Sequence, residues 1–223
     1  MVKFTKKLSQ FSYILSFDLA KRVSGYSLYD INKNIVLAAG VLDTSKNKDD
    51  FIWGYFYSQV IKIIEKCKEI IGPENEDGLF VVKERLPSQN GRFSTIETLQ
   101  GLAQAHSIFD LAVNQCCVEV YDYDGVHATS VKSHFKKLTG SDKPQKEDIA
   151  EYCKQRYVDF DFSQYPFDVT DSLGVTLTLI GKKWNSDIVE KIRELKKEQK
   201  SAKTEVKITK LEDEIKFLES LKN

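Results

Sequence analysis

The sequence predicts an α/β protein with a five-stranded mixed sheet flanked by helices, followed by a helical C-terminal extension. Short runs rich in Tyr, Ile, Leu and Val come first, with turn-sized gaps between them, and this pattern is typical of an antiparallel meander. Further apolar runs then alternate with segments whose apolar residues recur at helical spacing. Beyond Trp184 the composition changes to mixed charge with a heptad-like apolar repeat.

The first half of the chain predicts the meander, one helix and a buried strand. The stretch LFVVKE is apolar through Val82 and then charged, as expected of a central strand that is buried on both faces and emerges at its carboxyl end, Glu84. The helix before it ends at the turn-forming sequence GPENEDG. The expected strands and helix span residues 13–18, 25–30, 35–42, 49–71 and 79–84.

The second half predicts one more strand among four helices. Ser94 and Glu97 have capping-box spacing, so a helix is expected to begin there and to reach about Asn114. The proline and the two acids of PFDVTD suit a helix that begins near Asp168. The fifth strand and the two intervening helices are expected at residues 117–123, 125–138 and 145–158.

The last segment of the chain forms a second predicted region, which divides the protein into residues 1–184 and 185–223. Its heptad-like positions step by alternating four and three from Ile188 to Val206 and continue in a shifted phase from Leu211. The break between them fits either a stutter or the bend of a helical hairpin. A strut packed on the same chain, a dimer contact and a partner helix are all compatible with this pattern.

Composition narrows the class of protein. The 223 residues include 33 Lys and Arg against 33 Asp and Glu, so a nucleic-acid partner requires a local basic patch rather than a global positive field. The four cysteines have no C-x-x-C spacing and are expected to be reduced thiols, which predicts a cytoplasmic protein. No apolar run approaches the roughly 18 residues of a membrane span, and the first residues lack the apolar core of a secretory signal.

Four acidic residues are predicted to converge. Asp18 ends the first strand and Glu84 the fourth, and the ends of neighbouring strands lie side by side in an open sheet. Asp168 and Asp171 stand three apart at a helix start and therefore project on one face of that helix. Charges about 4 Å apart repel by roughly 4 kcal/mol per pair at an effective dielectric near 20, so such a cluster requires cations. Hard oxygen ligands select Mg²⁺ or Mn²⁺, and two such ions would support hydrolysis of a phosphodiester in nucleic acid.

Each acid also has a purely structural interpretation. Asp18 fits the start of a turn, and an acid at a helix start fits an N-cap. Glu84 fits a salt bridge to Lys83 or Arg85. The metal site is favoured by the combination of a strand-end Asp, a strand-end Glu and a helix-start D-x-x-D in one chain.

Five stretches of the chain resemble a known family: SFDLAKRVSGYSL, VVKERL, TLQGLAQAHSIFDLAVNQ, ATSVKSHFKKLTGSDKPQKEDI and FDVTDSLGVTLTLI. Through them, over roughly residues 12–181, the chain resembles the RuvC branch of the RNase H-like superfamily, the Holliday junction resolvases. The resemblance implies a homodimeric, Mg²⁺-dependent crossover junction endonuclease of DNA recombination and repair, able to use Mn²⁺ instead. It places the metal ligands at Asp18, Glu84, Asp168 and Asp171.

The resemblance also assigns a basic patch. Lys132 and Lys146 match basic residues that flank the site in that family, where they contact the phosphate or assist cleavage, and Lys146 is therefore a candidate catalytic residue. The window 132–146 has a local net charge of +4, which suits it to holding phosphates, whereas ordinary helix-surface charge is the plain alternative. Its lysines are Lys132, Lys136, Lys137, Lys143 and Lys146.

The loop after Glu84 supplies three more candidate DNA contacts, Arg85, Arg92 and Phe93. Family members have an aromatic residue here that stacks at the junction crossover, although Phe93 also fits a packing contact ahead of the helix.

Two stretches differ from the family pattern. The chain has DLA where relatives usually show DPG, with Lys21 and Arg22 directly after it, so this turn is more basic and poorer in glycine. Gly174 stands where a small alanine is common, which is expected to be neutral.

The sequence therefore predicts a structure-selective endonuclease that nicks four-way DNA junctions by two-metal-ion hydrolysis. Two alternatives stay open. One keeps the fold and changes the substrate to flaps, other branched DNA or RNA, and the other is a module that binds branched DNA without cutting it.

Overall fold

The computed structural model describes residues 11–45, 51–86, 95–120, 125–164, 166–201 and 205–220. The chain divides into two compact units, Met1–Thr178 and Leu179–Asn223. The division falls inside one long helix, a few residues before the domain boundary predicted at 184/185, which stays a prediction.

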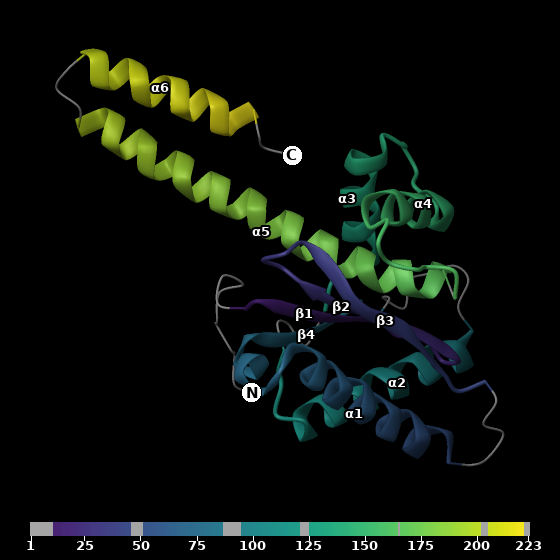
Figure 1. Ribbon diagram of the computed structural model, residues 1–223. Helices are drawn as coiled ribbons and strands as arrows, with labels where there is room; N and C mark the ends of the chain where they lie inside the picture. Colours follow the sequence, from purple (N-terminus) through teal and green to yellow (C-terminus); the bar gives the residue numbers. More distant parts are fainter. Residues whose placement is uncertain are drawn as a thin grey trace. The chain divides into compact units, whose positions relative to one another are not determined.

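A five-stranded mixed sheet forms the centre of the first unit (Figure 1). Its strands are β1 (Tyr13–Asp18), β2 (Val23–Asp30), β3 (Ile35–Asp43), β4 (Leu79–Lys83) and β5 (Glu119–Val120). They lie in the order β3-β2-β1-β4-β5. The first three strands form the antiparallel meander, whereas β4 lies parallel to both β1 and β5. The predicted five-stranded mixed sheet is confirmed.

Strand β5 is shorter than the predicted run of residues 117–123. Cys117 has a φ of 54°, a left-handed backbone conformation that a strand does not accommodate, so the strand begins only at Glu119. Residues 121–124 lie outside the described residues. Strand β2 begins two residues earlier than predicted, because Val23 and Ser24 already pair with β3.

Helices cover both faces of the sheet, with α1 and α2 on one face and α3, α4 and the first part of α5 on the other (Figure 1). The helical elements are α1 (Ile52–Ile71), η2 (Pro73–Gly78), α2 (Ile96–Gln115), α3 (Ala128–Thr139), α4 (Lys146–Arg156), α5 (Pro166–Ser201) and α6 (Glu205–Ser220). Helix α2 is capped by Thr95, whose hydroxyl accepts a hydrogen bond from the Thr98 amide at 3.2 Å. The predicted cap, Ser94, lies outside the described residues.

Alternation along β1 explains this layering. Leu15 and Phe17 point into the apolar core that α1 and α2 complete. Ser16, between them, points to the opposite face and donates a hydrogen bond to the Ser172 carbonyl of α5 at 2.8 Å. The sheet is therefore buried on both faces, as the apolar sequences of β1 and β4 predict.

Helix α5 packs unusually closely on the sheet because small residues face it. A Cβ at Gly25 of β2 would lie 1.9 Å from the Asp168 carbonyl oxygen, so only glycine fits there. The Ser16 hydroxyl lies 2.8 Å from the Ser27 hydroxyl. It also accepts a hydrogen bond from the Thr176 hydroxyl at 2.8 Å. These contacts fix the position of the α5 N-terminal turns relative to the ends of β1 and β2.

The second unit contains a helical hairpin made by the end of α5 and by α6. Four apolar residues of the two helices, Ile192, Leu195, Leu211 and Ile215, are buried against one another. Lys196 and Glu219 form an ion pair at 2.9 Å across the hairpin. The shift of heptad phase in the sequence therefore reflects the bend of a hairpin rather than a stutter.

Two further expectations concern the cysteines and the membrane. Cys67, Cys116, Cys117 and Cys153 are all free thiols, as predicted. Within the described ranges, no helix combines the length and the apolar character needed to cross a membrane.

Candidate active site

Two carboxylates meet where adjacent parallel strands end. Asp18 is the last residue of β1, and Glu84 directly follows β4, whose Lys83 is in register with Phe17. The Glu84 amide donates to the Phe17 carbonyl at 2.9 Å, which extends the pairing past the end of the strand. Because the two strands end together, the Asp18 and Glu84 side chains are close enough to share a hydrogen bond.

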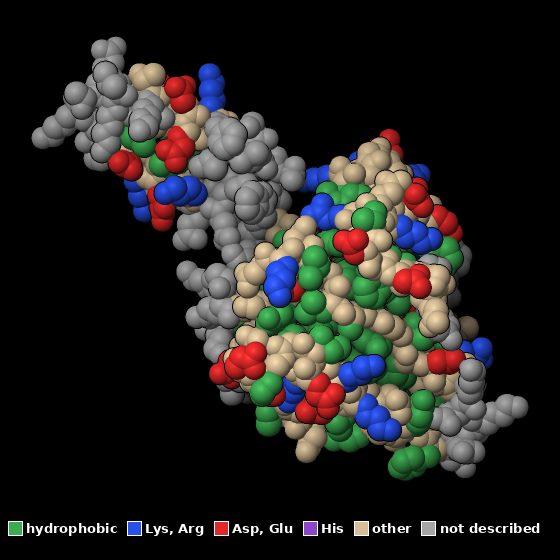
Figure 2. All heavy atoms as spheres, in the orientation of Figure 1, with side chains coloured by type: hydrophobic (Ala, Val, Ile, Leu, Met, Phe, Trp, Pro, Cys, Tyr) green, Lys and Arg blue, Asp and Glu red, His purple; other side chains and the backbone are tan. Residues whose placement is uncertain are grey.

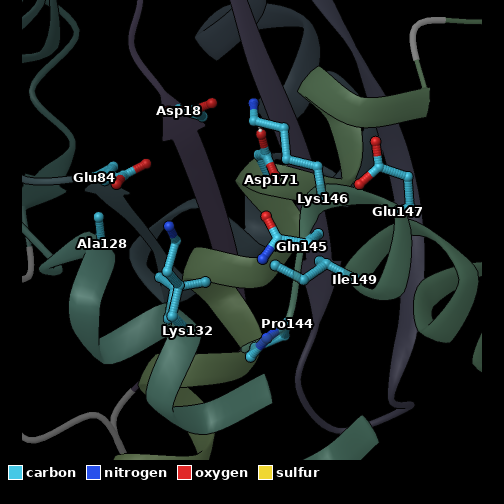
Figure 3. A pocket seen from close by; sticks show the side chains of 11 residues that line it. Asp18, Glu84, Ala128, Lys132, Pro144, Gln145, Lys146, Glu147, Ile149 and Asp171 are labelled. Carbon is cyan, nitrogen blue, oxygen red and sulfur yellow. Dashed lines mark hydrogen bonds and ion pairs between the residues drawn. The ribbon is translucent and has the colours of Figure 1, made fainter. Parts of the chain in front are cut away.

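A third acid comes from helix α5. Asp171 lines the same pocket as Asp18 and Glu84, a cavity of about 570 Å³ (Figure 3). Its Oδ2 accepts a hydrogen bond from the Lys146 ammonium, at the first residue of α4. Asp168, one turn earlier on α5, does not line the pocket, but its charge is near enough to raise the pKa of both Asp171 and Lys146.

Burial and mutual repulsion shape the protonation of these acids. Burial, followed by the neighbouring charge of Glu84, raises the pKa of Asp18 well above its usual range. Burial also raises the pKa of Glu84, even though its hydrogen bond to Asp18 opposes that shift. Burial raises the pKa of Asp171 as well, against the lowering effect of the Lys146 ammonium. Each of these three carboxyls is therefore harder to ionise in the metal-free pocket than in water.

The pocket offers the type of donor atom that divalent cations prefer, namely carboxylate oxygens. Two half-buried carboxyls in direct contact require a proton or a cation between them, and oxygen-only donors suit Mg²⁺ or Mn²⁺. Among the residues that the structure describes, no three metal-ligating side chains stand close enough together to hold an ion. Asp18 and Glu84 make the direct contact, and Asp171 is paired with Lys146.

Comparison with known proteins gives a consistent answer for the fold. No protein-family model matches the chain, and no curated protein matches it in sequence. Solved structures do match. RuvC of Thermus thermophilus in complex with a Holliday junction substrate superposes with a TM-score of 0.54 at 16% identity, over 74% of this chain and 90% of RuvC.

The chain has the RuvC fold. A second Thermus thermophilus RuvC structure gives a TM-score of 0.53 at 16% identity, over 74% of this chain and 92% of that one. The yeast mitochondrial Holliday junction resolvase Ydc2 gives 0.50 at 12% identity, over 74% and 76% of the two chains. These matches confirm the RuvC, RNase H-like architecture that the sequence resemblance predicts.

In this RuvC fold, two of the predicted lysines reach the pocket. Lys132 of α3 and Lys146 of α4 both line it, and their amines extend toward the space bordered by the acids (Figure 3). Burial lowers the pKa of Lys146, but contact with Asp171 outweighs it and the net effect is a raised pKa. Lys146 is therefore a fixed cation at the pocket.

The other candidate DNA contacts that the structure describes do not line the pocket. Lys136 forms an exposed ion pair with Asp142 at 2.7 Å, and Lys137 and Lys143 are exposed. Arg85 is half-buried, with its guanidinium 2.8 Å from the His127 ring. Arg92 and Phe93 lie outside the described residues.

Lys83 is not the partner of Glu84 that the structural interpretation suggested. Its side chain is 3% exposed and points away from the pocket, where its ammonium pairs with Asp110 of α2 at 2.5 Å. Successive residues of a strand face opposite sides of the sheet, so Lys83 and Glu84 cannot share one environment.

Sequence reasoning missed the residues that position Lys146. Gln145 caps α4: its side chain accepts a hydrogen bond from the third residue of the helix, and its amide donates to Asp148 Oδ2 at 2.8 Å. This capping box fixes the start of α4, where Lys146 begins the helix beside the pocket. The Q-x-x-D spacing ahead of an amphipathic segment is the signal that could have predicted it.

Proposed function

We propose that the protein is a structure-selective endonuclease that nicks four-way Holliday DNA junctions by metal-dependent hydrolysis. The observation that supports this most strongly is the contact between the half-buried Asp18 and Glu84 side chains at the end of the sheet, in a pocket shared with Asp171 and two lysines. The fold is that of RuvC, which is known in complex with a Holliday junction substrate, and of the Ydc2 resolvase.

As ligands of the divalent metal we propose Asp18 and Glu84, which are in direct contact, and Asp171, which would have to move from its contact with Lys146 to join them. Asp168 adds negative charge from the preceding turn of α5. Mg²⁺ is the expected ion and Mn²⁺ the expected substitute. Bound there, such ions supply an activated water and stabilise the leaving oxygen of a phosphodiester. The two carboxyls at the strand ends contribute negative charge in a buried site, which raises their affinity for a cation over that of exposed acids.

The basic residues have complementary roles in this proposal. Lys146 lowers the pKa of Asp171 through direct contact, against the effect of burial, and would offer a positive charge to a scissile phosphate. Lys132 points into the same space from α3. Further phosphate and base contacts are proposed at the outer residues Lys136, Lys137, Lys143, Arg85, Arg92 and Phe93.

A comparison of DNA substrates tests the function. The protein is incubated with a labelled four-way junction, a flap and a plain duplex, each with Mg²⁺ and then with EDTA. The proposal predicts paired, symmetric nicks on the junction alone, lost with EDTA. Cleavage of flaps alone would contradict the proposal and support a nuclease with a different branched substrate. Tight binding without any cutting would support a module that binds branched DNA.

Symmetric nicking requires two active sites on one junction, so we propose that the protein acts as a homodimer. Sedimentation of the protein with and without a junction measures this directly. A monomer bound to each junction would contradict the paired nicks.

A further inference from the structure

A second pair of cations follows Asp18 in the sequence, outside the basic patch of residues 132–146. Lys21 and Arg22 follow Asp18 by three and four residues, in the turn between β1 and β2, and both side chains are exposed. In the part of the chain that the structure describes, neither residue forms an ion pair. Among the described residues, therefore, no acidic side chain neutralises either cation.

Lys21 packs on the helical layer opposite the one that bears Lys132 and Lys146. Its aliphatic stem crosses Gly101 of α2, where an added Cβ would meet Lys21 Cδ at 2.8 Å and Cγ and Cε at 3.2 Å. Helix α2 covers one face of the sheet, whereas the helices that bear Lys132 and Lys146 cover the other (Figure 1). Asp18 and Glu84, at the ends of their strands, lie at the sheet edge between these two layers.

The turn that presents the two cations is held firmly by hydrogen bonds. The Ser24 hydroxyl accepts from the Ala20 amide at 3.0 Å and donates to the Ala20 carbonyl at 3.1 Å. The buried Thr44 hydroxyl donates to the Lys21 carbonyl at 3.1 Å and to the Arg22 carbonyl at 2.9 Å. Because these hydrogen bonds hold the backbone of the turn, the Lys21 and Arg22 side chains project from defined positions.

We propose that Lys21 and Arg22 form a second phosphate-binding site, which holds the DNA strand on the far side of the scissile phosphate from Lys132 and Lys146. This inference rests on the proposed nuclease function. A site with phosphate contacts on both sides binds a continuous strand, which is the requirement for cutting inside a strand rather than at its end. Gly101 supplies the groove in which the Lys21 stem lies.

Salt-dependent binding of a four-way junction in EDTA tests the proposal without requiring cleavage. Each lost phosphate contact reduces the slope of log affinity against log salt by about 1. Lys21→Gln and Arg22→Gln are each expected to show that reduction, with a severalfold loss of affinity at moderate salt. Lys62→Gln, an exposed lysine of α1, is the matched control and should keep the wild-type slope.

A variant of the groove gives an independent test. In Gly101→Ala the added methyl group displaces the Lys21 stem, and since the neighbour is a flexible side chain the fold is retained. Its affinity should fall toward that of Lys21→Gln, and the double variant should be no weaker than Lys21→Gln alone. Thermal unfolding of each variant confirms that the loss is not one of folding.

Wild-type slopes in Lys21→Gln and Arg22→Gln would overturn the second phosphate site while leaving the proposed function intact. A wild-type protein that binds no DNA would overturn both.

Placement is tested with junctions in which a single phosphate on one side of the cut is replaced by a neutral methylphosphonate. A replacement on either side of the cut should weaken cleavage by the wild type. In Lys21→Gln, the replacement on the side that Lys21 contacts should have no further effect, whereas the replacement on the other side should still weaken cleavage. Unchanged sensitivity on both sides would contradict the placement of Lys21.

Discussion

Asp18 bears the largest electrostatic strain in the site. Burial and the contact with Glu84 raise its pKa, so the folded protein retains a proton there at a pH where the unfolded chain has lost it. The stabilising contribution of such a group is fully present below the unfolded pKa, near 3.9, and is lost as the pH rises through the folded pKa. A side chain that needs neither a proton nor a charge at this position should therefore stabilise the metal-free fold.

Asp18→Asn should accordingly stabilise the protein while abolishing cleavage. The expected gain at pH 7.5 in EDTA is about 1–2 kcal/mol, or roughly 2–6 °C in the melting temperature. Mn²⁺ should raise the melting temperature of the wild type and leave that of the variant unchanged. Asp159→Asn, an exposed acid, is the control, and a destabilised Asp18→Asn would refute the account of strain.

The contribution of His106 to stability should depend on pH in the opposite sense to that of Asp18. Burial, and then the nearby Lys83 ammonium, lowers the pKa of His106 to about 4. The unfolded chain takes up this proton first, so the free energy of unfolding should fall as the pH drops from about 6.5 toward 4, by roughly 2 kcal/mol after allowance for partial exposure. Urea denaturation of wild type and His106→Gln between pH 7 and 4.5 measures how the free energy of unfolding changes with pH. Equal pH dependence in the two proteins would contradict this assignment.

At the scale of elements, the fit of α5 against β2 sets the position of Asp171. The Cβ of alanine at Gly25 would collide with the backbone of Asp168, which cannot move without shifting the helix. Gly174, on the same helix, has its nearest neighbour at 3.3 Å, a side-chain methyl of Val131.

Gly25→Ala should therefore cost about 1–3 kcal/mol and reduce cleavage more than it reduces junction binding. Gly174→Ala, the matched control, should change stability by no more than about 1 kcal/mol, because a small overlap offsets the better helix propensity of alanine. Urea denaturation and single-turnover cleavage measure both variants. Similar behaviour of the two would show that α5 adjusts freely and that its close packing has no functional role.

The strand ends were predictable because burial leaves a clear pattern. An apolar run that stops at a charge, as at Glu84, indicates where a central strand leaves the core, and parallel neighbours such as β1 and β4 end together. The pairing of Asp171 with Lys146 was not predictable, because it depends on how α4 and α5 pack rather than on spacing along the chain. The left-handed backbone at Cys117, which shortens β5, has no local sequence signal either.

At the scale of the whole molecule, positive and negative charges balance. Figure 2 shows acidic and basic side chains interspersed over one face, with no field of a single sign, in keeping with the formal net charge of +0. DNA binding would then depend on the few cations around the pocket rather than on long-range attraction. Composition alone predicted this need for a local patch, but not the second pair of cations at Lys21 and Arg22.

The C-terminal hairpin buries four of its own apolar residues against one another, so these four are not available for a dimer contact. Deletion of residues 186–223 should leave the oligomeric state unchanged, because Ile192 and Leu195 already pack against α6. Sedimentation velocity of the full and shortened chains makes the comparison. A shift toward a lighter species would assign the hairpin to assembly.

The most direct test of the central claim is the cleavage of a synthetic four-way junction by wild type and Asp171→Asn. Asp171 lines the pocket but is not part of the Asp18–Glu84 contact, so its amide variant should keep junction binding. Paired nicks by the wild type with Mg²⁺, absent with EDTA and reduced at least about 100-fold in Asp171→Asn, are the predicted result. Nicking that survives either EDTA or the substitution would contradict an acid-built metal site.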